Sequence, residues 1–186
     1  MPRTIRACFG GHVYHVLNRG NGQADVFHSL EDFASFVGLM QEANQKVSMR
    51  LVGYCLMMNH FHLMLWPHED GDISRWMQWL MTTHVRKYHL KYQTSGHVWQ
   101  GRYKSFMVNE EEHYLTVLRY IERNPIRAGL VTRCEDWEWS SFQPTVRSGP
   151  AGLLSDGPVA KPPHWYQIVN GVESNEELKR IRDSIS

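Results

Sequence analysis

The chain has 186 residues, which suits one domain, or one domain with an appended tail, and can bury a substantial core. Its formal net charge of +1 does not by itself indicate a nucleic-acid partner, so any such signal must be local. No segment approaches the roughly 18 uninterrupted apolar residues of a membrane span, and the first residues do not resemble a signal peptide. We therefore expect a cytoplasmic protein that does not contact membranes. Cys8, Cys55 and Cys134 are too far apart for a Cys-x-x-Cys zinc site, and their odd number does not fit a disulfide framework, so reduced thiols are expected.

The first elements are predicted from side-chain periodicity. His12–Leu17 is short and rich in Val and Tyr, and turn-forming residues 18–22 follow it, which predicts a strand and then a loop. Ser29 precedes Asp32 by the spacing of a capping box, which begins a helix. Apolar residues then recur at intervals of three and four through residues 33–47, which predicts a helix face that packs against a core.

The centre of the chain predicts a hairpin. Arg50–Met57 and His60–Trp66 have the length of strands, and a tight turn is expected near Met58 and Asn59. The elements expected after it are a helix over 72–92, a strand within 98–108 and a helix over 110–124 that Pro125 ends. This irregular alternation predicts an α+β fold with a mostly antiparallel sheet, most economically the split β-α-β arrangement.

The composition changes beyond Phe142. Pro and Gly crowd residues 144–163, which indicates a linker or a wrapped loop. Ser174–Ile185 is charged and has a plausible cap, so a small surface helix is expected there. We divide the chain into a domain of residues 1–145 and a Pro/Gly-rich linker with a C-terminal tail, residues 146–186.

His60 and His62 form a candidate metal site. On a strand, residues i and i+2 point to the same face, so both imidazoles project together while Phe61 faces the core. Neutral histidine is the commonest metal ligand in proteins. An isolated His-x-His, however, is more often a hydrogen-bonded pair without a metal, so a further partner decides between the two interpretations.

The third predicted helix supplies that partner. Tyr120 and Asn124 lie one helical turn apart along the edge of its apolar stripe. An amide oxygen of Asn124 could be a third ligand of the kind that suits Mg²⁺ or Mn²⁺. Tyr120 beside such an ion could be a nucleophile, since a cation favours the phenolate. Tyr114 competes for this role, but its position within the apolar stripe predicts a core residue.

A basic and aromatic surface is the candidate binding site for nucleic acid. Residues 73–109 contain no Asp or Glu but six Lys and Arg, and Trp79 shares a helix face with Arg75 and Arg86. A phosphate backbone and a stacked base fit this mixture. The alternative to a DNA-binding surface is a solvated basic face of the helix, with Trp79 packed under a loop. The candidate DNA-binding residues are Arg19, Arg75, Trp79, Arg86, Lys87, Trp99, Arg102 and Lys104.

These patterns together resemble a known family. His60-Phe61-His62 resembles the His-hydrophobic-His motif of HUH nucleases, and Tyr120–Pro125 resembles the catalytic-helix signature of single-tyrosine transposases. The chain is most similar to the REP-associated tyrosine transposase family, over roughly residues 5–145. Three further segments carry this resemblance: Asn18-Arg19-Gly20, Trp99-Gln100-Gly101-Arg102 and Trp137–Ser141.

The resemblance implies a function and a fold. His60 and His62 would bind a divalent ion, Mg²⁺ or Mn²⁺, with Asn124 as its third protein ligand. Tyr120 would attack a DNA phosphate and give a 5′-phosphotyrosine link and a free 3′-hydroxyl. The implied substrate is single-stranded DNA with palindromic hairpins and a flanking tetranucleotide, and the implied fold is a ferredoxin-like or RRM-like palm. Such a protein would work in the cytoplasm at the nucleoid, as a monomer or a homodimer.

Two other functions remain open from the sequence. A retired transposase that binds DNA hairpins without cleaving them would share the basic surface but would need no metal and form no covalent adduct. A metallo-hydrolase of small substrates is a third, weaker hypothesis, and steep salt dependence of DNA binding would count against it.

Overall fold

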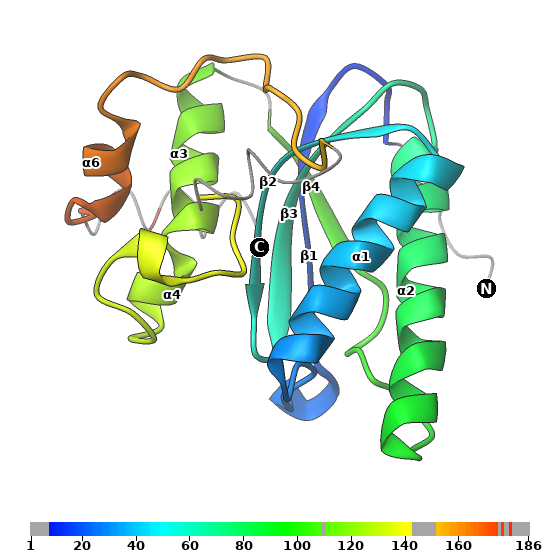
Figure 1. Ribbon diagram of the computed structural model, residues 1–186. Coiled ribbons are helices and arrows are strands. Elements are labelled where there is room, and N and C mark those ends of the chain that lie inside the picture. The colour runs from blue at the N-terminus through cyan, green and yellow to red at the C-terminus, as the bar shows by residue number, and fades with distance from the viewer. Residues whose placement is uncertain (1–7, 109–110, 143–151, 175, 177–178, 180–186) are drawn as a thin grey trace.

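The computed structural model describes residues 8–108, 111–142, 152–174, 176 and 179. Its elements in chain order are β1 (Val13–Arg19), η1 (Asn21–Gln23), α1 (Leu30–Lys46), β2 (Met49–Met57), β3 (His60–Pro67), α2 (Asp72–Tyr92), β4 (Lys104–Val108), α3 (Glu111–Glu122), α4 (Asn124–Arg127), η2 (Cys134–Asp136) and α6 (Trp165–Asn170). The strands form an antiparallel sheet in the order β2-β3-β1-β4. Helices α1 and α2 cover one face, and α3, α4 and α6 lie on the other (Figure 1). The predicted α+β fold, of ferredoxin-like or RRM-like topology, is confirmed.

The local signals that predicted the first elements act as expected. The Asp32 carboxylate accepts a hydrogen bond from the backbone N–H of Ser29 at 2.9 Å, so the capping box begins α1 one residue after Ser29. Strands β2 and β3 pair antiparallel from Met57 opposite His60, which confirms the hairpin and its turn.

The three cysteines are free, buried thiols. None of the helices in the described ranges is long and apolar enough to cross a bilayer.

Alternation along β3 divides its side chains between two cores. Phe61, Leu63 and Leu65 belong to the core beneath α1 and α2. Met64 belongs to the core beneath α3 and α6, on the same side as its alternating neighbours His60 and His62. The histidines therefore face α3 rather than α1 and α2.

Helix α3 lies close to the sheet because β2 has a glycine where they meet. A Cβ atom at Gly53 would lie 2.5 Å from Leu118 Cδ1, which is closer than van der Waals contact allows. Gly53 also follows a register irregularity between β2 and β3, and such bulges redirect a strand locally. Leu118 is fully buried there, so the close contact fixes the height of α3 above the sheet.

Two boundaries differ from the prediction. Strand β1 continues through Asn18 and Arg19, which were predicted to begin a loop, because β3 pairs with both of them. Pro125 does not end the helical path: α3 ends at Glu122, and α4 begins at Asn124 with Pro125 in its first turn. Proline is tolerated there because the first turn of a helix needs no intrahelical N–H donor.

The chain after α4 covers the edge of the sheet. Leu56 N–H donates to the Trp139 carbonyl and Ser141 N–H to the Tyr54 carbonyl, both at 2.8 Å. Further on, Ser155 N–H donates to the Leu51 carbonyl. These bonds use the outer hydrogen-bonding groups of β2, which would otherwise form an exposed edge.

Residues 152–174, most of the described part of the predicted linker and tail, pack onto the domain as a wrapped segment. Trp165 and Val169 of α6 are buried against α3. The helix predicted over Ser174–Ile185 falls largely outside the described residues.

His84 makes the stability of the fold depend on pH. Its ring is 6% exposed, accepts a hydrogen bond from Trp99 Nε1 at 3.3 Å, and burial lowers its pKa to about 4. The unfolded chain binds a proton at this residue near pH 6.5, whereas the folded chain does so only near pH 4.

His84 should therefore lower the free energy of unfolding by up to about 3 kcal/mol as the pH falls from 6.5 to 4. Urea unfolding between pH 4 and 7 tests this, since His84→Gln should flatten the pH dependence; equal slopes would refute it.

Candidate active site

The orientation of His60 is set by its neighbour in the turn. The side-chain amide of Asn59 donates through Nδ2 to the Gln23 carbonyl at 2.9 Å, so its oxygen faces the His60 ring. His60 Nδ1 lies 2.7 Å from that oxygen and must carry the hydrogen, because a carboxamide oxygen can only accept. In the neutral ring, the lone pair of His60 is then on Nε2, the atom left free to bind a metal.

His62 is oriented by a third histidine that the sequence analysis did not single out. His15 on β1 is fully buried, and its Nε2 lies 2.8 Å from His62 Nδ1. The two rings stack with centroids 5.0 Å apart. When the shared hydrogen is on His62 Nδ1, the Nε2 lone pair of His62 is free for a ligand. Alternation along β1 could have assigned His15 to the same face as Val13, but only the β1–β3 register identifies that face.

Asn124 reaches His60. Its carboxamide lies within hydrogen-bonding reach of the His60 ring and counteracts the lowering of that ring's pKa, which is the effect of an oxygen acceptor. Nδ2 of Asn124 is buried and has no hydrogen-bond partner among the residues that the structure describes. The Asn124 oxygen and the second ring nitrogen of His60 are both acceptors, so a cation bound between them would satisfy both.

The imidazoles stay neutral near pH 7. Burial, followed by the charges of Arg19 and Arg127, lowers the pKa of His60 to about 4. Burial and the nearby His113 lower the pKa of His15 to about 3, and burial holds the pKa of His62 well below its ordinary value. Neutral rings have the lone pairs that metal binding requires.

The donor set therefore fits a divalent ion held by His60, His62 and Asn124. The two imidazole nitrogens suit a divalent transition-metal ion, and the amide oxygen is the kind of ligand that Mn²⁺ or Mg²⁺ prefers. Within the described ranges, no group of three or more His, Cys, Asp or Glu side chains could hold a metal. Asn124 is thus the residue on which this candidate site depends.

Tyr120 lies beside the histidines. Its half-buried ring packs edge-on against His62, with centroids 5.7 Å apart, and against His15 at 6.2 Å. The guanidinium carbon of Arg127 lies 3.8 Å from the centre of the Tyr120 ring. The structure thus brings the predicted nucleophile, His60, His62 and Asn124 together, and adds Arg127 to them.

Tyr114 is unsuited to be the nucleophile. Its side chain is 4% exposed in the core between α3 and the sheet. Gly157 of the C-terminal segment packs directly against its hydroxyl, where a Cβ atom could not fit. A DNA phosphate could reach this hydroxyl only if the core opened.

Two of the candidate DNA-binding residues lie on the face that carries the histidines. Arg19 is exposed on β1 directly opposite His60, and its charge contributes to the lowered pKa of that histidine. Lys104 is exposed on β4 opposite Leu17, on the same face. Arg102 is exposed in the loop that leads into β4. These cations can meet a phosphate backbone that enters the site.

The candidates on α2 lie in the other layer, away from the histidines. Arg75 pairs with Asp72 at 2.6 Å, and Lys87 lies 3.7 Å from Glu42. Arg86 is exposed, while Trp79 is half-buried and packs against the core beneath α1 and α2. The sheet separates this surface from the candidate active site.

Trp99 is a core residue rather than a platform for bases. It is 5% exposed and packs against Phe27, Phe36 and Phe61. The prediction that it stacks on DNA is therefore corrected. The sequence suggested binding because Trp99 is followed by Arg102 and Lys104, a mixture of aromatic and basic residues.

Comparison with known proteins gives consistent matches. Residues 8–124 match the family model for IS200-like transposases. A protein named as a REP-associated tyrosine transposase in Haemophilus influenzae is 29% identical over 108 residues, which cover 52% of this chain and 61% of the relative. A solved REP-associated tyrosine transposase bound to a REP hairpin has the same fold, with a TM-score of 0.60 and 19% identity over 88% of this chain and 96% of that one. The resemblance inferred from the sequence is confirmed.

The burial of Trp99 predicts a stability defect in place of a binding defect. Trp99→Ala should lower the free energy of unfolding by about 3–5 kcal/mol, the usual cost of truncating a buried tryptophan. Trp79→Ala, at a half-buried position, is the matched control and should cost less. Urea unfolding measures both values, and an unchanged stability of Trp99→Ala would contradict the assignment to the core.

Proposed function

This chain belongs to the family of IS200-like transposases, and we propose that it is a metal-dependent single-strand DNA endonuclease and strand transferase that cleaves DNA at REP-like hairpins. The observation that carries the proposal is the contact of Tyr120 with His62, next to His60 and the Asn124 amide. This combination provides a nucleophile and an electrophile-binding site on adjacent elements.

The polarity of the proposed reaction is the one that the resemblance to single-tyrosine transposases implies. Tyr120 Oη attacks a backbone phosphorus and the P–O3′ bond breaks, which leaves the phosphate joined to Tyr120 through its 5′ side. The phenol loses its proton to solvent, and the departing 3′ oxygen takes one up, so charge and atoms balance. Attack by another 3′-hydroxyl on the phosphotyrosine then rejoins a strand and restores the phenol. A divalent ion, Mg²⁺ or Mn²⁺, bound by His60, His62 and Asn124 would polarise the phosphate.

The substrate is inferred from charge and from the relatives. Arg19 lies opposite His60 on the neighbouring strand, where its charge would face the scissile phosphate. One relative is named for REP association, and the solved structure holds a REP hairpin. We therefore propose single-stranded DNA with palindromic hairpins as the substrate, acted on in the cytoplasm at the nucleoid.

Covalent capture tests the proposal. Incubation with a labelled single-stranded hairpin and Mn²⁺ should give a protein–DNA adduct on a denaturing gel, and EDTA should remove it. Tyr120→Phe should abolish the adduct because phenylalanine has no nucleophilic oxygen. Tyr114→Phe is the matched control and should keep it.

Two outcomes would contradict the assignment. An adduct that persists in Tyr120→Phe but disappears in Tyr114→Phe would show that Tyr114, and not Tyr120, is the nucleophile. Hairpin binding without any adduct, with or without Mn²⁺, would favour a retired transposase that only binds DNA.

Salt dependence tests the location of the DNA. Arg19→Gln and Lys104→Gln should each weaken hairpin binding and reduce the slope of log Kd against log salt by about 1, because each removes one phosphate contact. Arg75→Gln should have little effect, since Arg75 is paired with Asp72 on the opposite layer. Fluorescence anisotropy across a salt series measures this. If Arg75→Gln had the larger effect, the DNA would lie on α2.

A further inference from the structure

Arg127 contacts Tyr120 in two ways. Its guanidinium carbon lies 3.8 Å from the centre of the Tyr120 ring, and Nη2 donates to the Tyr120 carbonyl at 2.8 Å. That carbonyl lies in the last turn of α3, where backbone oxygens lack an intrahelical partner. One side chain therefore holds both the ring and the backbone of the proposed nucleophile.

Arg127 is itself held by the C-terminal segment, which is defined here as residues 152–174. Its Nη1 donates to both carboxylate oxygens of Glu173, at 3.2 Å and 3.1 Å. The Glu173 side chain is 5% exposed and also pairs with Arg123 Nε at 3.4 Å. A buried carboxylate between two guanidiniums is strongly held, because removal of one partner leaves the other charges buried and uncompensated.

The same segment is attached along α3. The Glu122 carboxylate, which is fully buried, accepts from Lys161 Nζ and from Trp165 Nε1, both at 2.7 Å. Arg123 Nη1 donates to the Val169 carbonyl at 2.7 Å.

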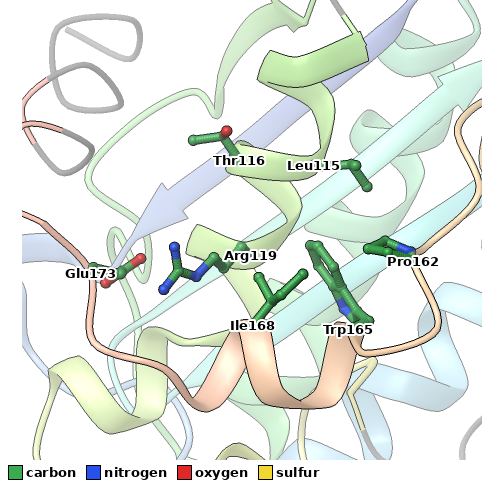
Figure 2. A pocket seen from close by; sticks show the side chains of 7 residues that line it. All are labelled: Leu115, Thr116, Arg119, Pro162, Trp165, Ile168 and Glu173. Carbon is green, nitrogen blue, oxygen red and sulfur yellow. The ribbon is translucent and has the colours of Figure 1, made fainter.

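The segment closes around the outer side of α3. A pocket of about 160 Å³ lies between the segment and α3. Figure 2 shows Arg119 and Glu173 pointing toward one another on one side of it, with Trp165 and Pro162 on the other. The segment lies beyond residue 124, where the match to the family model ends.

From these contacts we propose that Arg127 is a positioning residue for Tyr120, and that Glu173 of the C-terminal segment holds Arg127 in place. Tyr120 is half-buried, so its ring would be free to rotate away from His62 without a side chain stacked on it. Nucleophilic attack needs an aligned oxygen, and a displacement of about 1 Å can cost about 100-fold in rate. This inference rests on the proposed cleavage reaction for its kinetic part only.

The experiment compares Arg127→Gln, Arg127→Lys and Glu173→Gln with the wild type. The matched control is Arg133→Gln, which removes an exposed guanidinium that also lies over a tyrosine ring, 5.5 Å from the centre of Tyr166. The measurements are the single-turnover rate of adduct formation, the KM for the hairpin, and the ¹⁹F NMR shift of 3-fluorotyrosine placed at position 120.

Arg127→Gln should slow adduct formation about 100-fold with KM changed less than about threefold, and should move the ¹⁹F resonance. Arg127→Lys should recover only part of the rate, because an ammonium cannot stack or fork as a guanidinium does. Glu173→Gln should slow the reaction about tenfold, since it weakens the charge-assisted contact but keeps its shape. Arg133→Gln should change none of the three measurements.

An unchanged rate and ¹⁹F shift in Arg127→Gln and Glu173→Gln would overturn the proposal. A loss confined to KM would also overturn it, because Arg127 would then contact the DNA instead of Tyr120. If the wild type forms no adduct, the proposed function fails, but the ¹⁹F shifts still decide whether Arg127 and Glu173 position Tyr120. Glu173→Gln keeps the test decisive if Arg127→Gln does not fold.

Discussion

The contact between α3 and β2 is the constraint on which the candidate site depends. Leu118 packs where Gly53 has no side chain, so α3 sits low over the sheet. Tyr120, two residues further along α3, then meets His62 with ring centroids 5.7 Å apart. A larger residue at position 53 would collide with Leu118 Cδ1, so this packing would have to change. The site therefore depends on backbone geometry as much as on the residues that would do chemistry.

Hydrogen bonds on the sheet side prepare the imidazoles. Asn59 donates to the Gln23 carbonyl, and its oxygen sets the tautomer of His60. His15 Nε2 lies within hydrogen-bonding distance of His62 Nδ1. Burial keeps these rings neutral, so their lone pairs stay available. Such partners orient metal-binding histidines in other proteins, where their loss weakens metal binding or activity. On the helix side, Glu173 of the C-terminal segment holds Arg127, and Arg127 in turn packs against the ring of Tyr120.

Much of the fold was predictable because its signals are local. The capping box at Ser29, the alternation around His60 and the periodicity of residues 72–92 each depend on neighbours in sequence. The same alternation assigned His60 and His62 to one face, and the helical spacing paired Tyr120 with Asn124. The role of Trp99 was not predictable, because an aromatic residue near an arginine gives the same sequence pattern whether its ring contacts DNA or is buried in a core.

The residues that were missed depend on long-range pairing. His15 meets His62 across 47 positions, and Arg127 meets Glu173 across 46. No local period reports such contacts. Glu173 also lies in the tail that the sequence analysis separated from the domain, although residues 165–169 of this part pack against α3. The separation of the α2 surface from the histidines likewise follows only from the layer order of the fold.

The central claim is that His60, His62 and Asn124 bind one divalent ion beside Tyr120. Anomalous diffraction from a Mn²⁺-soaked crystal tests it most directly, because the peak locates the ion independently of any DNA chemistry. The account predicts one strong peak within bonding distance of the free Nε2 atoms of His60 and His62 and of the Asn124 oxygen, at about 2.1–2.3 Å. A peak at another place, or the Asn124 amide turned away from a bound ion, would contradict it.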